Sequence, residues 1–176
     1  MEGRYKYNMK QLIEIIKTLS NCQVHEPTRL PEFDKDKYVL PSDLKEFYSL
    51  CGGLVLFENE EYAIHIVAPE EFVLANPIII GELCADDISS NWYIIGEDCM
   101  DGYVTMDLSE ERLGRCYDSF FDRHGIVGES QIIANSFTDL LINLINNQGQ
   151  YWYWLKRNFK PLGDAYDEGE KVIDKL

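Results

Sequence analysis

The sequence lacks the marks of secreted, disulfide-bonded and membrane-spanning proteins. Its five cysteines are odd in number and form no Cys-x-x-Cys pair, so we expect reduced thiols rather than a disulfide framework. No apolar run approaches the roughly 20 residues that span a bilayer, and residues 1–10 lack the apolar core of a signal peptide. These absences predict a cytoplasmic protein that does not bind membranes.

Positive charge is missing from the middle of the chain. Residues 46–111 hold 15 Asp and Glu side chains and no Lys or Arg, so this segment supplies the excess behind the formal net charge of −15. The resulting field repels nucleic acid and accelerates association with basic proteins. The charge therefore favours a basic protein partner over nucleic acid, although solubility alone explains an acidic composition equally well.

Histidine is scarce, and its three positions show no metal-ligand spacing. His25, His65 and His124 are too scattered for a zinc site built on local spacing. We interpret His65 as a packed or surface side chain. A Cys–His nucleophilic pair stays open, because such partners meet only in the fold, but no flanking motif supports one. We predict a protein that is not an enzyme, with no catalytic residue, no cofactor and no bound metal.

The chain contains enough apolar surface for one folded domain. It has 176 residues, 45% of them hydrophobic, a size at which folding buries roughly 70% of the unfolded surface. Apolar residues recur every three or four positions over residues 8–19 and again over 136–149, which predicts amphipathic helices. A further helix is expected over 41–51, ended by a left-handed C-cap at Gly52-Gly53.

Short β-branched and aromatic runs between these helices predict strands. The expected strands are 54–57, 62–67, 92–96, 103–108 and 115–121, with a short helix over 68–75. Strands 92–96, 103–108 and 115–121 follow one another at the short spacing of hairpins. This spacing favours antiparallel pairing over a doubly wound parallel sheet. The prediction is a single α+β domain, with a mostly antiparallel sheet flanked by helices at its N- and C-terminal ends.

The end of the chain differs in composition from the rest. We expect the domain to span residues 1–149, and residues 150–176 to form an aromatic and acidic extension packed on the domain or trailing from it. If residues 151–159 are helical, Trp152, Leu155 and Phe159 share one face. Such a face suits either an interface or packing on the protein's own core, and we favour the core. After Pro161 we expect loosely ordered chain.

Three carboxylates surround the predicted hairpin turn. Glu97, Asp98 and Asp101 lie within five residues of one another. A cation site or an acid/base pair would use such groups, but the alternating oxygen ligands of an EF-hand are absent. We therefore interpret the turn as a solvated hairpin tip.

Four short blocks between residues 40 and 145 resemble the SUKH superfamily of Smi/Knr-like proteins. The blocks are Leu40-Pro41 with Phe47-Tyr48 and Gly52-Gly53; Trp92 to Asp98; Asp101-Gly102-Tyr103 running to Asp107; and Ile133 to Phe137 with Leu140-Leu141. Their order and spacing carry the likeness. The chain departs from the family pattern at Cys51, where the family usually has a polar residue such as Asn, and in its C-terminal extension.

The resemblance implies helices around an antiparallel sheet, and it also implies a function. Many bacterial members are immunity proteins that bind and neutralise a polymorphic toxin, often a nuclease or deaminase, whereas fungal relatives regulate cell-wall synthesis through protein contacts. The family has no shared catalytic set to transfer to this sequence.

Our leading hypothesis is a non-catalytic bacterial immunity protein (an antitoxin) that binds a basic toxin domain through an acidic surface. The alternative is an intracellular regulator or scaffold of the Smi/Knr type, and an enzyme of unrecognised type ranks last. Oligomeric state is not predicted. The expected partner-binding residues are five carboxylates and, if exposed, one aromatic anchor: Glu97, Asp98, Asp101, Glu110 and Glu111, with Trp92 or Tyr103.

Overall fold

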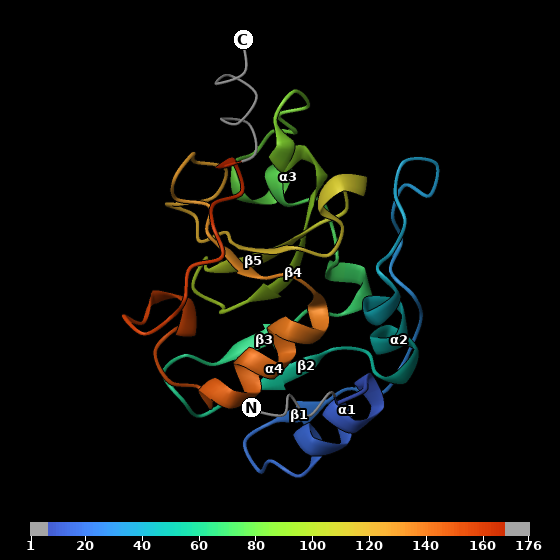
Figure 1. The fold of residues 1–176 in the computed structure, drawn as a ribbon. Helices are drawn as coiled ribbons and strands as arrows, with labels where there is room; N and C mark the ends of the chain where they lie inside the picture. Colours follow the sequence, from blue (N-terminus) through green and yellow to red (C-terminus); the bar gives the residue numbers. More distant parts are fainter. Residues whose placement is uncertain (1–6, 168–176) are drawn as a thin grey trace.

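A computed structural model describes residues 7–167 of the chain. Its centre is a seven-stranded sheet in which the strands follow one another in chain order and every neighbouring pair is antiparallel (Figure 1). The strands are β1 (Gln23–Val24), β2 (Leu54–Leu56), β3 (Ile64–Ile66), β4 (Trp92–Glu97), β5 (Tyr103–Asp107), β6 (Cys116–Asp118) and β7 (Ile132–Ala134). The prediction of an α+β domain with an antiparallel sheet is confirmed.

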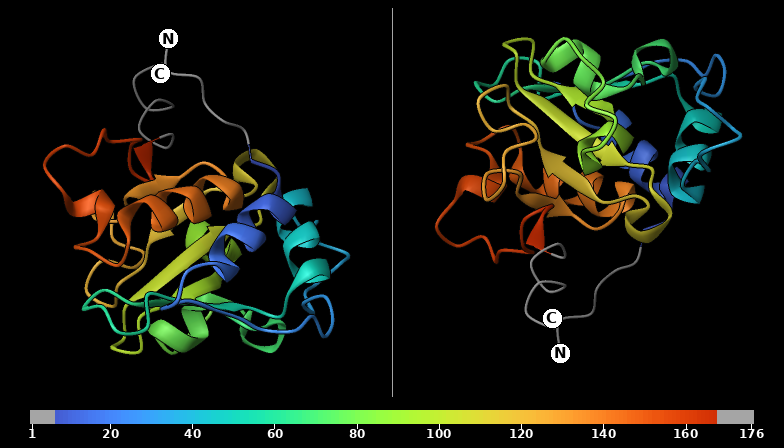
Figure 2. Two further views of the ribbon diagram at one scale, coloured as in Figure 1. Left: turned by 90° about the horizontal axis from the view of Figure 1, so that it is seen from below. Right: turned by 90° about the horizontal axis from the view of Figure 1, so that it is seen from above.

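Helices cover both faces of this sheet. They are α1 (Met9–Lys17), α2 (Ser42–Leu50), α3 (Ala75–Ile79) and α4 (Phe137–Asn147). The described residues also contain four 3-10 turns: η1 (Pro69–Glu71), η2 (Ile88–Asn91), η3 (Glu110–Arg112) and η4 (Tyr153–Leu155). Figure 2 shows α1 and α4 on one face of the sheet and α3 on the other. Within residues 7–167, no helix is both long and apolar enough to cross a membrane.

Local chemistry explains where the two strongest helices begin. Asn8 accepts a hydrogen bond from the Gln11 amide, and the Gln11 side chain accepts one from the Asn8 amide, both at 2.9 Å. This reciprocal cap satisfies two amides that the first turn of α1 leaves free. Ser136 caps α4 in the predicted way, because its Oγ accepts from the Asp139 amide at 3.1 Å. Both helices then bury one apolar stripe against the core.

The structure corrects three local predictions. Strands β1 and β7 were not expected, because two or three residues are too short to show a period. The helix expected over 68–75 is only the 3-10 turn η1, and α3 follows it as a separate element. Helix α2 ends with Cys51 in an extended conformation rather than in a left-handed glycine.

The glycine pair after α2 serves close packing. The Gly52 amide donates to the His25 carbonyl at 2.9 Å, and the His25 amide donates to the Gly53 carbonyl at 3.1 Å. A Cβ on Gly52 would collide with the carbonyl of Glu26, and Gly53 has a φ of +120°. The connector before α2 therefore lies directly against this pair, which only glycine permits.

The aromatic segment after α4 belongs to the core. Trp152 and Trp154 are buried and stack with ring centroids 5.1 Å apart. The Trp154 indole N–H donates to Asp118 at 3.1 Å. The interpretation of this cluster as core packing is confirmed, and the segment forms one 3-10 turn instead of the helix that was considered.

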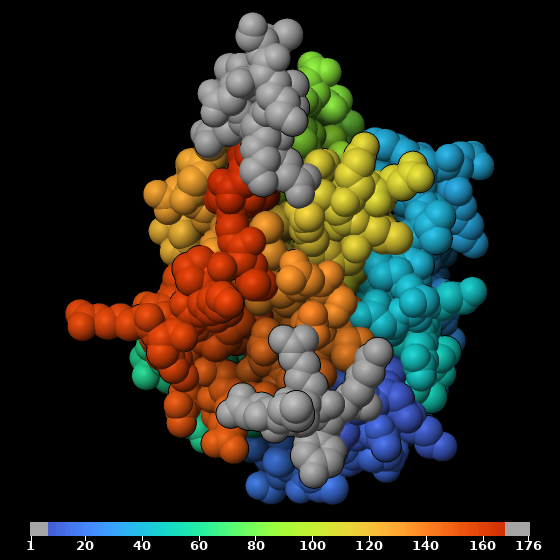
Figure 3. All heavy atoms as spheres, in the orientation of Figure 1, coloured from blue at the N-terminus to red at the C-terminus, as the bar shows by residue number. Residues whose placement is uncertain are grey.

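The chain after Pro161 is ordered as far as it is described, contrary to our expectation. The Ile132 amide donates to the Gly163 carbonyl, and the Ala165 amide donates to the Ser130 carbonyl, both at 2.9 Å. Figure 3 shows this last described segment, in red, running along the same face of the molecule as α4. Residues 168–176, which the same prediction covers, lie outside the described residues.

Candidate functional site

Antiparallel pairing brings two acidic turns to the same end of the sheet. His65 near the start of β3 lies opposite Glu97 at the end of β4, so the turn before β3 and the turn after β4 are neighbours, both on the left of Figure 1. We call this region the acidic end, and it comprises Glu58, Glu60 and Glu61 of residues 57–63, and Glu97, Asp98 and Asp101 of residues 97–102. Of these six side chains, only Glu97 and Asp98 are half-buried, and the other four are exposed.

Asp98 shapes the turn in which it lies. One of its carboxylate oxygens accepts from the amides of Met100 and Gly102, both at 2.8 Å. Cys99 and Asp101 adopt left-handed backbone conformations, with φ of 64° and 62°, which cost energy for residues other than glycine. The hydrogen bonds to Asp98 offset part of that cost. The neighbouring Asp101 carboxylate is exposed and accepts no such hydrogen bond from the turn.

Two large apolar side chains stand among these carboxylates. Met100 is 83% exposed and Phe121 is 69% exposed. The Phe121 amide donates to the Asp101 carbonyl at 3.4 Å, which holds the chain after β6 beside the turn. Exposed apolar groups with a charged rim are typical of protein interfaces. Neither residue was predicted from the sequence, because hydrophobic periodicity does not indicate which residues of a turn are exposed.

The structure divides the predicted set of partner-binding residues. Glu110 and Glu111 are exposed on η3, at the opposite end of β5 from the hairpin turn. Five residues of strand, at about 3.4 Å each, place roughly 15 Å or more between the two groups. Glu97, Asp98 and Asp101 therefore share a surface that Glu110 and Glu111 do not join.

The predicted aromatic anchors also separate. Tyr103 is half-buried opposite Glu97 and remains at the acidic end. Trp92 is fully buried and donates its indole N–H to Asp107 at 3.1 Å. The anchor role depended on exposure, so Trp92 belongs to the core and leaves the candidate surface.

Asp107 is a buried carboxylate at the end of the β4–β5 hairpin that lies farthest from the acidic end. Three donors converge on its Oδ2: the Trp92 indole at 3.1 Å, the Tyr117 hydroxyl at 2.9 Å and the Arg112 guanidinium at 3.1 Å. The Ser109 amide donates to its other oxygen at 2.8 Å. A carboxylate paired in this way fixes the far end of the β4–β5 hairpin and is costly to remove.

The fold brings together one Cys–His pair that sequence analysis had left open. The Cys99 Sγ lies 3.6 Å from Nδ1 and 3.9 Å from Nε2 of His65. Burial raises the pKa of the Cys99 thiol, and the carboxylates of Glu97 and Asp98 raise it further. A thiol kept protonated in this way is a poor nucleophile, so the surroundings do not favour covalent catalysis by this pair.

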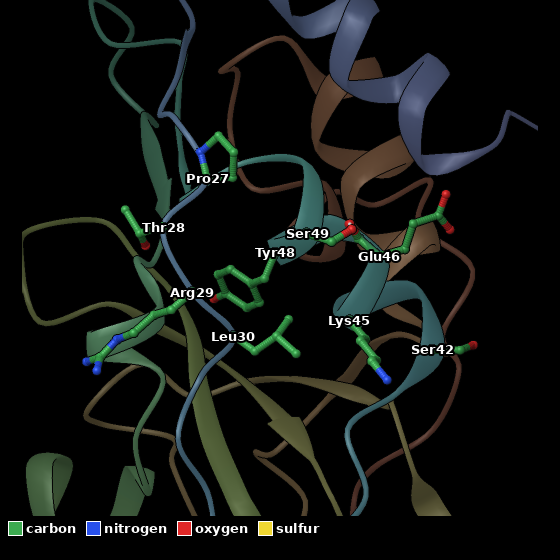
Figure 4. Close-up of a pocket in the computed structure, with 9 residues that line it drawn as sticks. All are labelled: Pro27, Thr28, Arg29, Leu30, Ser42, Lys45, Glu46, Tyr48 and Ser49. Carbon is green, nitrogen blue, oxygen red and sulfur yellow. The ribbon is translucent and has the colours of Figure 1, made fainter.

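A groove of about 490 Å³ runs between the connector at residues 27–30 and α2 (Figure 4). Its lining contains Arg29, Lys45 and Glu46 but no histidine or cysteine. Arg29 is already paired with Glu32 and Glu70, at 3.1 and 3.2 Å. The groove therefore offers no convergent acid, base or nucleophile of the kind that marks an active site.

The remaining histidine is buried in a polar network. The Nε2 atom of His124 lies 2.6 Å from the Asn76 Oδ1, and the Asn76 amide donates to Ser89 and to the Leu83 carbonyl. His124 is only 4% exposed. Burial lowers its pKa to about 4, and the Asp87 carboxylate offsets part of that shift.

This histidine predicts a loss of stability in mild acid. The unfolded chain takes up the proton near pH 6.5, whereas the folded chain resists it until about pH 4. The contribution of His124 is therefore complete above pH 6.5 and falls by about 3 kcal/mol as the pH drops to 4. Urea unfolding at several pH values should show a steeper decline for the wild type than for His124→Gln. The exposed control His25→Gln should keep the wild-type decline, and parallel curves for all three proteins would contradict the assignment.

Comparison with known proteins gives two matches. The model of the SMI1 / KNR4 family (SUKH-1) matches residues 34–143. A relative from Bacillus subtilis (strain 168), named "Immunity protein YokJ", is 56% identical over 160 residues, which cover 91% of this chain and 96% of the relative. No solved structure matches the chain significantly.

Proposed function

The chain belongs to the SMI1 / KNR4 family (SUKH-1), and from this premise we propose that it is an immunity protein that binds and neutralises a toxin in the cytoplasm, without catalysis. The name of its Bacillus subtilis relative supports the immunity role. A match that covers nearly all of both chains makes a shared general role the natural inference. Binding alone is enough for neutralisation, because a toxin whose active site is covered cannot reach its substrate.

The acidic end is the observation that carries the choice of surface. Two turns that lie far apart in the sequence present exposed carboxylates together with Met100 and Phe121. Exposed apolar anchors inside a ring of one charge suit a partner of the opposite charge. We assign the contact to a basic toxin domain of the nuclease or deaminase type, because enzymes that act on a polyanion need positive charge at their active sites.

If this is an immunity protein, we expect a gene next to its own to encode the toxin domain, and that domain tests the proposed function. Expression of that domain alone should arrest growth, and co-expression of this protein should restore it. The purified pair should form a stoichiometric complex. Growth arrest without rescue and without a complex would contradict the immunity role, and capture of an endogenous cellular protein instead would favour the regulator.

Charge complementarity predicts a salt-dependent association rate. Long-range attraction between an acidic surface and a basic partner is screened within about 10 Å at 0.1 M salt. Raising the ionic strength from 50 to 500 mM should therefore slow association at least tenfold, with a smaller change in the dissociation rate. Stopped-flow or surface-based kinetics measure both rates. An association rate that does not change with salt would show that the carboxylates do not steer the partner.

A further inference from the structure

Three side chains of metal-ligating type meet at the acidic end. His65 and Glu97 lie directly opposite each other on β3 and β4, so their side chains leave the same face of the sheet. Cys99 follows in the hairpin turn, where its left-handed backbone, with a φ of 64°, redirects the chain. One ligand atom from each of the three residues lies within 4.8 Å of the others.

The sulfur-to-nitrogen distance fits a tetrahedral metal. Zinc binds sulfur at about 2.3 Å and imidazole nitrogen at about 2.0–2.1 Å, so at a tetrahedral angle the two ligand atoms stand about 3.6 Å apart. Cys99 Sγ lies 3.6 Å from Nδ1 of His65 and 3.9 Å from Nε2. Because the sulfur is almost equally far from both nitrogens, binding requires the ring to turn so that the lone pair of one nitrogen faces the ion. The half-buried Glu97 carboxylate completes a face of three ligands.

The surroundings favour a cation over an isolated hydrogen bond. The carboxylates of Asp98 and Glu71 lie close enough to act electrostatically on the Cys99 sulfur. Negative charge stabilises a divalent ion, which in turn makes loss of the thiol proton favourable. Cys99 is exposed and the other two ligands are half-buried, so an ion can enter from solvent.

We propose that His65, Glu97 and Cys99 bind one Zn²⁺, with water in the fourth position. Imidazole, thiolate and carboxylate are the ligands that zinc uses in proteins, and three protein ligands with an open position are a known arrangement. On binding, the sulfur–metal bond replaces the S–H bond, and the proton leaves to solvent. The ion ties the β4–β5 turn to β3 and so stiffens the acidic end, and this site does not depend on the immunity role.

The experiment titrates the reduced, metal-free protein with Co²⁺ as a spectroscopic probe and then displaces it with Zn²⁺. One equivalent of Co²⁺ should produce a thiolate-to-metal charge-transfer band in the near ultraviolet, and Zn²⁺ should remove it. Cys99→Ser should abolish the band, and both Cys99→Ser and His65→Gln should weaken zinc binding at least 100-fold. Zinc should raise the melting temperature of the wild type but not of these variants.

Cys84→Ser is the matched control. Like Cys99, Cys84 has a positive φ (51°) and lies near two carboxylates, those of Glu82 and Asp87. It is half-buried, whereas Cys99 is exposed, and it is not part of the three-residue cluster. This variant should bind both metals as the wild type does. Absence of the charge-transfer band in the wild type, its survival in Cys99→Ser, or its loss in Cys84→Ser would each overturn the proposal.

Discussion

The double variant Glu61→Lys/Asp101→Asn is expected to associate with the toxin domain at least tenfold more slowly than the wild type, with a weaker dependence on salt. The two residues come from the two turns of the acidic end and are both exposed, so their substitution removes charge without opening the core. Asparagine is chosen at position 101 because it tolerates the left-handed backbone there. Asp98 is left intact because its carboxylate holds the turn.

The matched control is Glu110→Lys/Glu111→Gln. It changes the net charge by the same amount, on residues that are exposed at the opposite end of β5. Association kinetics should therefore separate a local contact from the field of the whole protein. We expect the control to retain most of the wild-type rate. Equal slowing by both variants, or no slowing by the first, would remove the acidic end from the interface.

Asp107→Ala is expected to lower the free energy of unfolding by about 3–5 kcal/mol. The substitution leaves the Trp92 indole, the Tyr117 hydroxyl and the Arg112 guanidinium without their shared acceptor. Unpaired buried donors carry the full cost of their lost hydration. Because domains of this kind are stable by only about 5–15 kcal/mol, such a loss is large.

Denaturant unfolding of two further variants tests whether the lost hydrogen bonds cause that loss of stability. Asp107→Asn keeps an acceptor oxygen and should fall between Ala and the wild type. Asp122→Ala removes a carboxylate that is 59% exposed and 3.5 Å from Arg123, and it should change stability by less than about 0.5 kcal/mol. An Asp107→Ala protein as stable as Asp122→Ala would show that the buried hydrogen bonds contribute little.

Sequence patterns predicted the elements that contain enough residues to show a period or a cap. The stripe of α1, the Ser136 cap of α4 and the β4–β5 hairpin are confirmed. Strands β1 and β7 were missed because their pairing depends on distant segments, such as the His25 connector lying against Gly52-Gly53. Tertiary contact, and not local propensity, defines such short strands.

The candidate site was found only in part for the same reason. The hairpin carboxylates were visible in the sequence, but their neighbours Glu60 and Glu61 join them only through the pairing of β3 with β4. The approach of Cys99 to His65 spans 34 positions of the chain and has no local signal. Burial of Trp92 is likewise a property of packing, because a tryptophan followed by a strand pattern suits either the core or an interface.

The most direct test of the account measures growth of cells that express the toxin domain expected from a neighbouring gene together with this protein or its variants. The wild type and Glu110→Lys/Glu111→Gln should protect the cells, whereas Glu61→Lys/Asp101→Asn should protect poorly although it is folded and equally abundant. That result would place neutralisation at the acidic end. Full protection by Glu61→Lys/Asp101→Asn, or loss of protection by the control alone, would contradict the central claim.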